Sequence, residues 1–337
     1  MASLLTLHLV AAVAAPALVR ALDRRAFYVL AVVPATAFGW AVSRTGTIVG
    51  SSGTTYDERY AWIASLGFDV DFRLDSLSWM MALLVSGVGA LVLIYCGSYF
   101  REHDPHLWRF TAVFTAFAGS MLGLVLSDNL LLMYVFWELT TVFSYLLVGH
   151  NPERKANRRA AMTALIVTTF GGLAMLVGVI MIGESSGSYR LTSLLADPPS
   201  GTLVTVSVGL LLIGAITKSA LVPFHFWLPG AMAAPTPVSA YLHAAAMVKA
   251  GIYLVAAAAP AFAASAFWRE PLLVLGVFTM ILGGLRALRQ YDVKLLLAYG
   301  TVSQLGFLMV VVGVGTRAAA LAGVAMIVAH ALFKAAP

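Results

Sequence analysis

Residues 217–237 read TKSALVPFHFWLPGAMAAPTP and decide how the rest of the sequence is interpreted. Four prolines fall within fifteen of these residues, so the stretch cannot be one regular helix, because each proline lacks a backbone donor. Yet Lys218 is its only charge, and apolar segments flank it on both sides. We interpret it as a helix broken at Pro223 and Pro229, although a proline-rich loop joining two helices would also fit the pattern.

The composition of the whole chain places this broken helix in a membrane. Of the 337 residues, 61% are hydrophobic and only 11% are charged, whereas about 25% of the residues of an average soluble domain are charged. The mean hydropathy is +0.90. A soluble domain of this size could not bury so much apolar surface. In a membrane, irregular backbone is tolerated only where other parts of the protein cover it or where it lines a water-filled cavity. We therefore predict an all-α polytopic membrane protein.

Apolar runs of about 20 residues can cross the hydrocarbon layer as helices, and the sequence has about eleven of them. They cover residues 3–19, 27–43, 76–98, 110–127, 129–149, 160–182, 203–232 with a break, 237–259, 272–288, 294–314 and 318–337. The longest polar linker, 44–75, predicts a modest extramembrane loop with a short hairpin. No linker is long enough for a second soluble domain.

The distribution of lysine and arginine predicts the orientation of the chain. One set of alternate loops carries twelve of these residues and the other set carries six. Because the richer set is expected in the cytoplasm, we predict that the N-terminus lies outside the cell membrane. The positive charge is spread over short loops, so a nucleic-acid surface is not expected.

Three lysines, Lys218, Lys249 and Lys334, are assigned to predicted spans rather than to loops, and Glu138 is the one acidic residue near the middle of a span. A charged side chain at a helix centre costs about 2.5–3.5 kcal/mol on the insertion scale, so these residues must be paired, neutral or in contact with internal water. A buried lysine that can lose its proton near neutral pH is suited to carrying protons. The alternatives are structural ion pairs between helices and lysines that reach the membrane surface.

Two histidines occur in the same part of the sequence and could relay protons, because histidine titrates near neutral pH. His330 and Lys334 are four residues apart and are expected on one helix face. His243 precedes Lys249 by six residues, about 240° of a continuous helix, so these two are not expected to share a face. Either histidine could instead be a hydrogen-bonded packing residue.

Four motifs resemble one known family. They are WELTT at 137–141 with SYLL at 144–147, KSALVPFHFWLPGAMAAPTPVSAYLHAAAMVK at 218–249, DVK at 292–294 with LAY at 297–299 and TVSQLG at 301–306, and HALFKA at 330–335. Together they resemble the antiporter-like subunits of respiratory complex I and of multisubunit Mrp cation/proton antiporters, from about Asp75 onward. The runs PFHFWLP and VKAGIYL are most similar to the large A-type subunits of Mrp antiporters.

The resemblance implies roles for the buried residues. Glu138 and Lys218 would be the pair whose charge state controls one half-channel, and Lys249 would be the next carrier. Lys334 would continue this polar axis, with His243 and His330 beside it. The mechanism expected from this arrangement is that Glu138 stabilises protonated Lys218, and that relieving this attraction releases the proton toward Lys249 and Lys334.

The resemblance also implies a division of the chain. Residues 1–109 would form N-terminal transmembrane helices with the extramembrane loop. Residues 110–259 would form the first of two inverted five-helix repeats, each with a broken helix, and 260–337 would begin the second. The family continues beyond the fourth motif, where this sequence stops at Pro337, so we expect the second repeat to be incomplete.

We expect this chain to be a proton-translocating subunit of a hetero-oligomeric antiporter in the cell membrane. The complex is expected to exchange protons for a monovalent cation, namely sodium. The alternatives are a proton-pumping membrane subunit of an NADH:quinone oxidoreductase or related redox complex, and a membrane anchor without an ion path. We expect no cofactor, because the sequence most similar to a dinucleotide fingerprint, Gly313-Val314-Gly315, follows an apolar span rather than a strand. We expect no metal site either, since the single cysteine and the loop at 103–106 lack further ligands.

Overall fold

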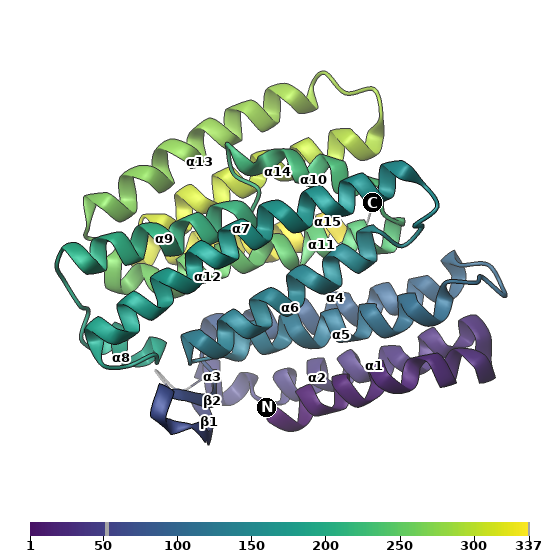
Figure 1. The fold of residues 1–337 in the computed structure, drawn as a ribbon, viewed down its shortest axis with the longest axis horizontal. Coiled ribbons are helices and arrows are strands. Elements are labelled where there is room, and N and C mark those ends of the chain that lie inside the picture. The colour runs from purple at the N-terminus through teal and green to yellow at the C-terminus, as the bar shows by residue number, and fades with distance from the viewer. Residues whose placement is uncertain (51–53, 336–337) are drawn as a thin grey trace.

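The computed structural model describes residues 1–50 and 54–335, which form a bundle of long helices with one small hairpin at its end (Figure 1). The first elements are α1 (Ala2–Leu22), α2 (Ala26–Ser43), α3 (Thr45–Gly50), β1 (Tyr56–Ile63), β2 (Phe68–Leu74), α4 (Ser76–Tyr99), α5 (Leu107–Leu126), α6 (Leu130–Val148) and α7 (Lys155–Ser186). The later elements are α8 (Leu191–Ala196), α9 (Thr202–Lys218), α10 (Trp227–Gly230), α11 (Thr236–Ala244), α12 (Met247–Phe262), α13 (Ala266–Ala287), α14 (Val293–Gly313) and α15 (Arg317–Ala335).

The helices confirm the predicted all-α polytopic class. Within the described ranges, nine helical stretches are long and apolar enough to cross a membrane, and the first of them, Ala2–Gly50, contains both α1 and α2. The apolar helix α9 is shorter than these nine. When α1 and α2 are counted separately and α9 is added, each of the eleven predicted spans contains a helix. The last predicted span, 318–337, and the predicted beginning of the second repeat, 260–337, both include residues 336–337, which lie outside the described residues.

The predicted break after Lys218 is present, and the chain itself ends the helix before the first proline. Ala220 adopts a left-handed conformation with φ 52°. Its amide donates to Thr217 O at 3.3 Å, and the amide of Leu221 donates to Ile216 O at 3.0 Å, which is the Schellman pattern of a helix C-terminus. Lys218 is therefore the last residue of α9 and does not lie near the centre of a longer span.

A second interruption was not predicted. The span expected at 237–259 is two helices, α11 and α12, because the amides of Ala245 and Ala246 both donate to Tyr241 O, at 3.2 and 3.1 Å. No proline or glycine lies at this point, so the sequence carries no signal for it. His243 lies on α11 and Lys249 on α12, so the prediction that placed both on one continuous helix is wrong.

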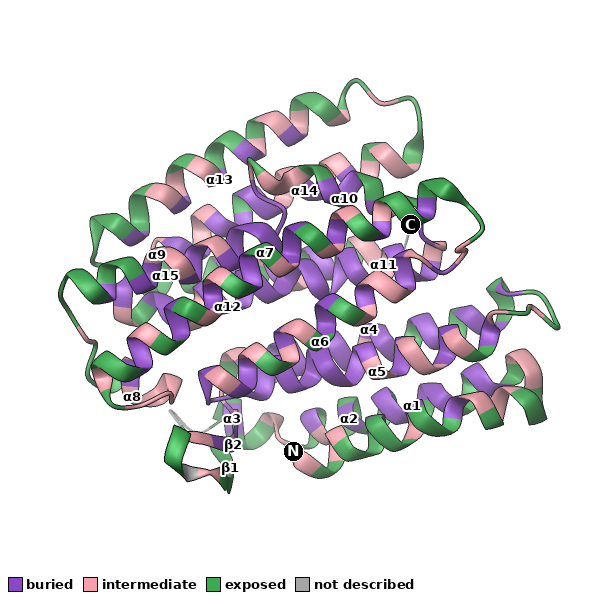
Figure 2. Cartoon of the chain, in the orientation of Figure 1, coloured by how far each residue is buried: buried purple, intermediate pink, exposed green. Residues whose placement is uncertain are grey.

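Burial is greatest in the middle of the bundle. Figure 2 shows buried residues concentrated along α5, α11 and α12, whereas α1 and α13 carry long exposed stretches. Many exposed side chains on these outer helices are large and apolar, for example Val13 at 74% and Val274 at 66%. An apolar exterior of this kind suits a lipid environment.

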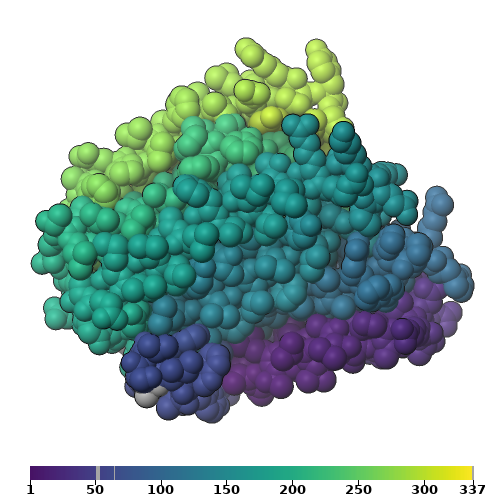
Figure 3. All heavy atoms as spheres, in the orientation of Figure 1, coloured from purple at the N-terminus to yellow at the C-terminus, as the bar shows by residue number. Residues whose placement is uncertain are grey.

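The polar linker forms the expected hairpin. Strands β1 and β2 pair in antiparallel register, and Figure 3 shows them as a knob at one end of the bundle, beside the N-terminal helices. Arg59 contacts Asp69 at 2.6 Å and Asp71 at 3.2 Å, and Arg190 lies 3.4 Å from Asp71 and 3.2 Å from Asp128. These ion pairs connect the hairpin to the loops before α6 and α8.

The two hairpin carboxylates have different electrostatic surroundings. The hydrogen bond from Arg59 lowers the pKa of Asp69 below its ordinary value. Burial raises the pKa of Asp71, although the guanidinium groups of Arg59 and Arg190 act in the opposite direction. Asp71 therefore depends on its cationic neighbours to remain charged.

We expect Arg190→Ala to lower the free energy of unfolding by about 1–3 kcal/mol, because the buried carboxylates of Asp71 and Asp128 would lose a cationic partner. Thermal unfolding of the purified protein in detergent measures the effect. Arg154→Ala, a change at an exposed arginine, serves as the control and should be nearly neutral. Equal melting temperatures for the two variants would show that the network does not stabilise the hairpin.

Candidate functional site

Lys218 is completely buried, and its ammonium group is held by α6. Its Nζ donates to Trp137 O at 2.9 Å and to Thr141 Oγ1 at 2.7 Å. The same Nζ lies 5.0 Å from the centre of the Trp137 ring, within the range of a cation–π interaction. Because Lys218 also ends α9, the negative end of that helix dipole favours its positive charge.

Glu138 follows Trp137 on α6, but the structure does not join it directly to Lys218. Among the described residues there is no ion pair within 4.0 Å between the two side chains, and Glu138 Oε1 is buried without a hydrogen-bond partner. They are close enough for each charge to act on the other. The predicted role of this pair thus rests on an interaction through space, while the direct contacts of Lys218 are a carbonyl and a hydroxyl.

Two adjacent glycines of α7 make room for these groups, and they were not among the predicted site residues. A Cβ atom added at Gly172 would overlap Glu138 Oε1, and one added at Gly171 would overlap the side chain of Thr217. The absence of side chains at these two positions lets α6 and α9 approach α7 closely. The only sequence signal for this was a pair of glycines inside an apolar span.

Lys249 lies on α12 and is also fully buried, but its surroundings differ from those of Lys218. Within the part of the chain that is described, Lys249 Nζ has no hydrogen-bond partner. It is the third residue of α12, where the positive end of the helix dipole opposes a positive charge. Ser219 Oγ donates to Val248 O at 2.9 Å, so neighbours of the two lysines fix α9 and α12 to each other.

His330 lies close enough to Lys249, Lys334 and His243 for the charges of these groups to act on it. Its ring is buried, and neither ring nitrogen has a hydrogen-bond partner among the described residues. The same is true of the buried ring of His243. The structure therefore brings His330, His243 and the two lysines into one region, from helices α11, α12 and α15.

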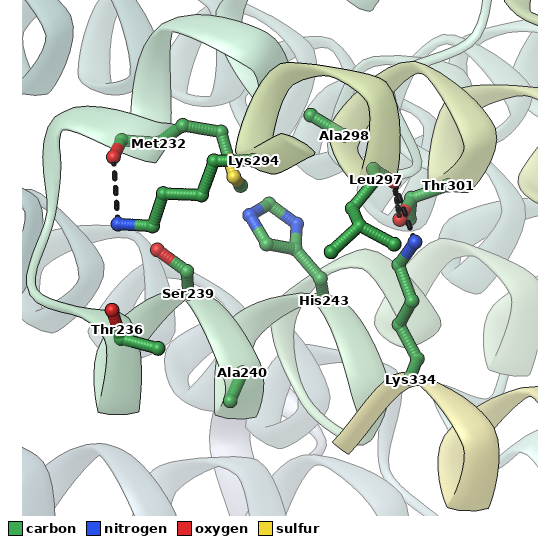
Figure 4. Close-up of a pocket in the computed structure, with 10 residues that line it drawn as sticks. All are labelled: Met232, Thr236, Ser239, Ala240, His243, Lys294, Leu297, Ala298, Thr301 and Lys334. Atoms are coloured by element: carbon green, nitrogen blue, oxygen red, sulfur yellow. Dashed lines mark hydrogen bonds between the residues drawn. The ribbon is translucent and has the colours of Figure 1, made fainter. Parts of the chain in front are cut away.

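A small cavity of about 50 Å³ next to this region could hold one or more water molecules. Figure 4 shows the His243 ring between the side chains of Lys294 and Lys334. Lys334 Nζ donates to Leu297 O at 2.5 Å, and Lys294 Nζ donates to Ala234 O at 2.9 Å and to Met232 O at 3.1 Å. Lys294 comes directly after a polar turn, so its place in the sequence had predicted a loop cation rather than a residue of this region.

The irregular backbone between α9 and α11 is covered by protein groups. The amide of Val222 donates to Thr279 Oγ1 at 2.9 Å, and Trp227 Nε1 donates to Thr217 O at 3.0 Å. Pro223 follows the end of α9, and Pro229 lies within the short helix α10. The predicted prolines thus lie in the broken segment, with side chains supplying the hydrogen bonds that a continuous helix would make.

We expect Gly171→Ala to lower the free energy of unfolding by about 1–3 kcal/mol, because the new methyl group would overlap the stiff β-branched side chain of Thr217. Gly39→Ala is the control, since a Cβ there meets no atom of the described residues within 4 Å, and it should be neutral or stabilising by up to about 1 kcal/mol. Thermal unfolding in detergent compares the two variants. A Gly171→Ala protein with an unchanged melting temperature would show that α7 and α9 can move apart without loss of stability.

Sequence comparison identifies relatives across most of the chain. A family model described as NADH:quinone oxidoreductase/Mrp antiporter, TM, matches residues 127–336, which is more than half of the chain. A second model, described as NADH-Ubiquinone oxidoreductase (complex I), chain 5 N-terminus, matches residues 61–111.

Two curated relatives illustrate the similarity. The A/B-type subunit of a probable K(+)/H(+) antiporter from Rhizobium meliloti is 47% identical over 292 residues, which are 85% of this chain and 29% of that protein. The A-type subunit of a Na(+)/H(+) antiporter from Alkalihalophilus pseudofirmus is 44% identical over 273 residues, or 80% of this chain and 34% of that protein. The chain thus spans about a third of the length of these relatives.

Solved structures share the fold. A chain of the Mrp complex from Dietzia sp. DQ12-45-1b superposes with a TM-score of 0.91 at 37% identity, covering 99% of this chain and 36% of that one. A chain of the archaeal membrane-bound sulfane sulfur reductase, at 22% identity, has the same fold with a TM-score of 0.86, covering 99% of this chain and 69% of that one. The matched residues and the shared architecture show that this chain belongs to the NADH:quinone oxidoreductase/Mrp antiporter transmembrane family.

Proposed function

We propose that this chain is the proton-translocating part of a monovalent cation/proton antiporter subunit. Protons would move along Glu138, Lys218, Lys249, His330, His243 and Lys334. The observation that carries the proposal is that ionisable side chains from five helices gather in the interior, four of them buried and two, Glu138 and Lys334, half-buried, and that several of their polar atoms have no partner among the described residues. The named antiporter relatives support the cation/proton assignment.

The two central lysines differ in a way that would drive transfer from one to the other. Lys218 has two oxygen acceptors and the negative end of a helix, so its protonated form is supported. Lys249 has neither, so a proton placed there is held weakly and can move on. Removing the negative charge of Glu138 would weaken the hold of Lys218 on its proton and release it toward Lys249.

Water inside the bundle would complete the path. Unpartnered buried nitrogen and oxygen atoms are costly unless water satisfies them. Within residues 1–50 and 54–335, such atoms occur at Glu138, Lys249, His330 and His243. Water molecules bridging these groups would satisfy the polar atoms and supply the intermediate sites for proton hops.

The wider setting is also part of the proposal. We place the chain in the cell membrane with its N-terminus outside, in a complex with other antiporter proteins. We take Na⁺ as the exchanged cation, as the name of the Alkalihalophilus relative suggests, although the Rhizobium relative is named for K⁺. Residues 110–259, which contain α5 to α12 except the first turn of α5 and the last turn of α12, would form the first five-helix repeat. Residues 1–109 would form the N-terminal part, and 260–337 would begin the second repeat.

A second candidate function is a proton-pumping membrane subunit of an NADH:quinone oxidoreductase or related redox complex, which the description of the matching family includes. The two candidates make different complexes. Purification of the tagged full-length protein from its native membrane separates them, since small antiporter subunits would accompany it in one case and peripheral redox subunits in the other.

Replacement of the central lysines tests the path. We expect Lys218→Ala and Lys249→Ala each to reduce cation-dependent proton transport at least about tenfold, because each removes a titratable carrier from the buried path. Transport is measured by fluorescence of a pH dye in membrane vesicles that contain the assembled complex. Lys155→Ala, at an exposed lysine, should leave the rate unchanged. A normal transport rate in the Lys218→Ala variant would contradict the proposed mechanism.

Glu138→Gln tests the interaction through space. We expect the pH profile of transport to move toward lower pH by about one unit, since loss of the negative charge makes protonated Lys218 less stable. Full pH profiles in the same vesicles measure the shift. An unchanged profile at an unchanged rate would show that the two groups do not act together.

A further inference from the structure

A second cavity lies at the hairpin end of the bundle, away from the buried lysines. It has a volume of about 850 Å³ and is bounded by the hairpin, α6, α7 and the segment that follows α7. Its mouth carries the charged groups of Arg59, Asp69, Asp71, Glu184 and Arg190. Three carboxylates and two guanidinium groups leave one net negative charge, which keeps the mouth hydrated and favours cations over anions.

Asp71 has unused hydrogen-bonding capacity in this mouth. It is 2% exposed, and both of its carboxylate oxygens lie within 3.4 Å of a guanidinium nitrogen. Neither oxygen receives a hydrogen bond among the described residues. A buried carboxylate with free lone pairs at the wall of a cavity is a binding point for water or a small cation.

A further part of the cavity wall runs along two helices and is partly exposed, since Ile180 is 43% exposed. On α6 it contains Leu131 and Tyr134, and on α7 it contains Gly183, Ile180 and Leu176. These positions step along each helix by about one turn and so form one groove between α6 and α7.

The next turn of each helix leads to the candidate site. Four residues beyond Tyr134 on α6 lies Glu138, and four residues before Leu176 on α7 lies Gly172. Gly172 leaves room for the Glu138 carboxylate, since any side chain there would overlap Glu138 Oε1. The groove therefore ends about 6 Å, one helical turn, from the Glu138 position.

We propose that this cavity is the aqueous access route from the hairpin side to Glu138. Water and small cations, protons above all, enter between the charged groups of the hairpin, pass Tyr134 and reach the carboxylate in the space left by Gly172. What the route carries rests on the proposed function, whereas its accessibility to water does not.

The route can be tested by the reactivity of a thiol at its inner end. Cys96 is the only cysteine within residues 1–337, so Cys96→Ala removes the competing thiol of this part of the protein before Glu138→Cys is introduced. The full-length protein is assembled with its complex in membrane vesicles and exposed, from each side separately, to a small cationic methanethiosulfonate reagent that cannot cross membranes. Mass spectrometry of the peptide that contains position 138 measures the labelling rate.

Two plugging changes and one matched control identify the path. Leu176→Trp and Ile180→Trp each place an indole in the groove, while Val177→Trp changes an exposed neighbour on α7 that does not line the cavity. We expect labelling from the hairpin side, slowed at least about tenfold by either plug and by no more than about twofold by the control, because thiolates react only where water reaches them.

Labelling from the opposite side alone, no labelling in an assembled complex, or labelling that neither plug slows would each overturn the proposal. Retention of transport by Lys218→Ala would instead contradict the proposed function and leave this labelling result unaffected. The two ideas can therefore fail independently. The second plug guards against a folding defect in the first.

Discussion

The burial of Lys218 constrains this structure more than any other feature, because an ammonium group inside a membrane bundle needs partners that water would otherwise provide. Trp137 O meets part of this need, and it also accepts from the hydroxyls of Thr140 and Thr141 at 2.7 and 3.2 Å. Thr141 then accepts from Lys218 through the same hydroxyl. One carbonyl of α6 is thus the centre of a small polar network, and α6, α7 and α9 must approach closely around it.

This close approach explains features that lie outside the network itself. Glycines occur where α7 faces Glu138 and Thr217, and at Gly251 of α12, where a Cβ would overlap Ser219 and Ala215 O. The end of α9 places Lys218 at the negative end of a helix, and the start of α12 places Lys249 at a positive end. The two helix interruptions therefore give the two lysines opposite electrostatic surroundings at nearly the same place in the bundle.

The molecule contains two polar systems with different degrees of pairing. At the hairpin end, Arg59 and Arg190 connect three carboxylates and join loops that are far apart in sequence. In the interior, several ionisable atoms have no partner among the described residues. Paired charges fix a structure, whereas unpaired buried groups favour a change of protonation state or contact with water. The ion pairs at the hairpin end are thus suited to stabilising the mouth of the cavity, and the unpaired ionisable groups in the interior are suited to proton exchange.

The sequence by itself determined the membrane class, the eleven apolar spans, the hairpin in the linker and the break after Lys218. These follow from local properties: hydropathy over about 20 residues, a polar linker, and prolines that cannot continue a helix. It also identified Lys218, Lys249, Lys334 and Glu138, because a charge in an apolar run is conspicuous in one dimension. The tertiary structure decided which groups meet. The contact of Lys218 with Trp137 O and Thr141, the break between α11 and α12, and the position of Lys294 beside His243 depend on how separate helices pack. These contacts cannot be predicted from any one span, because every residue has a backbone carbonyl and a glycine in an apolar run does not indicate which helix it packs against.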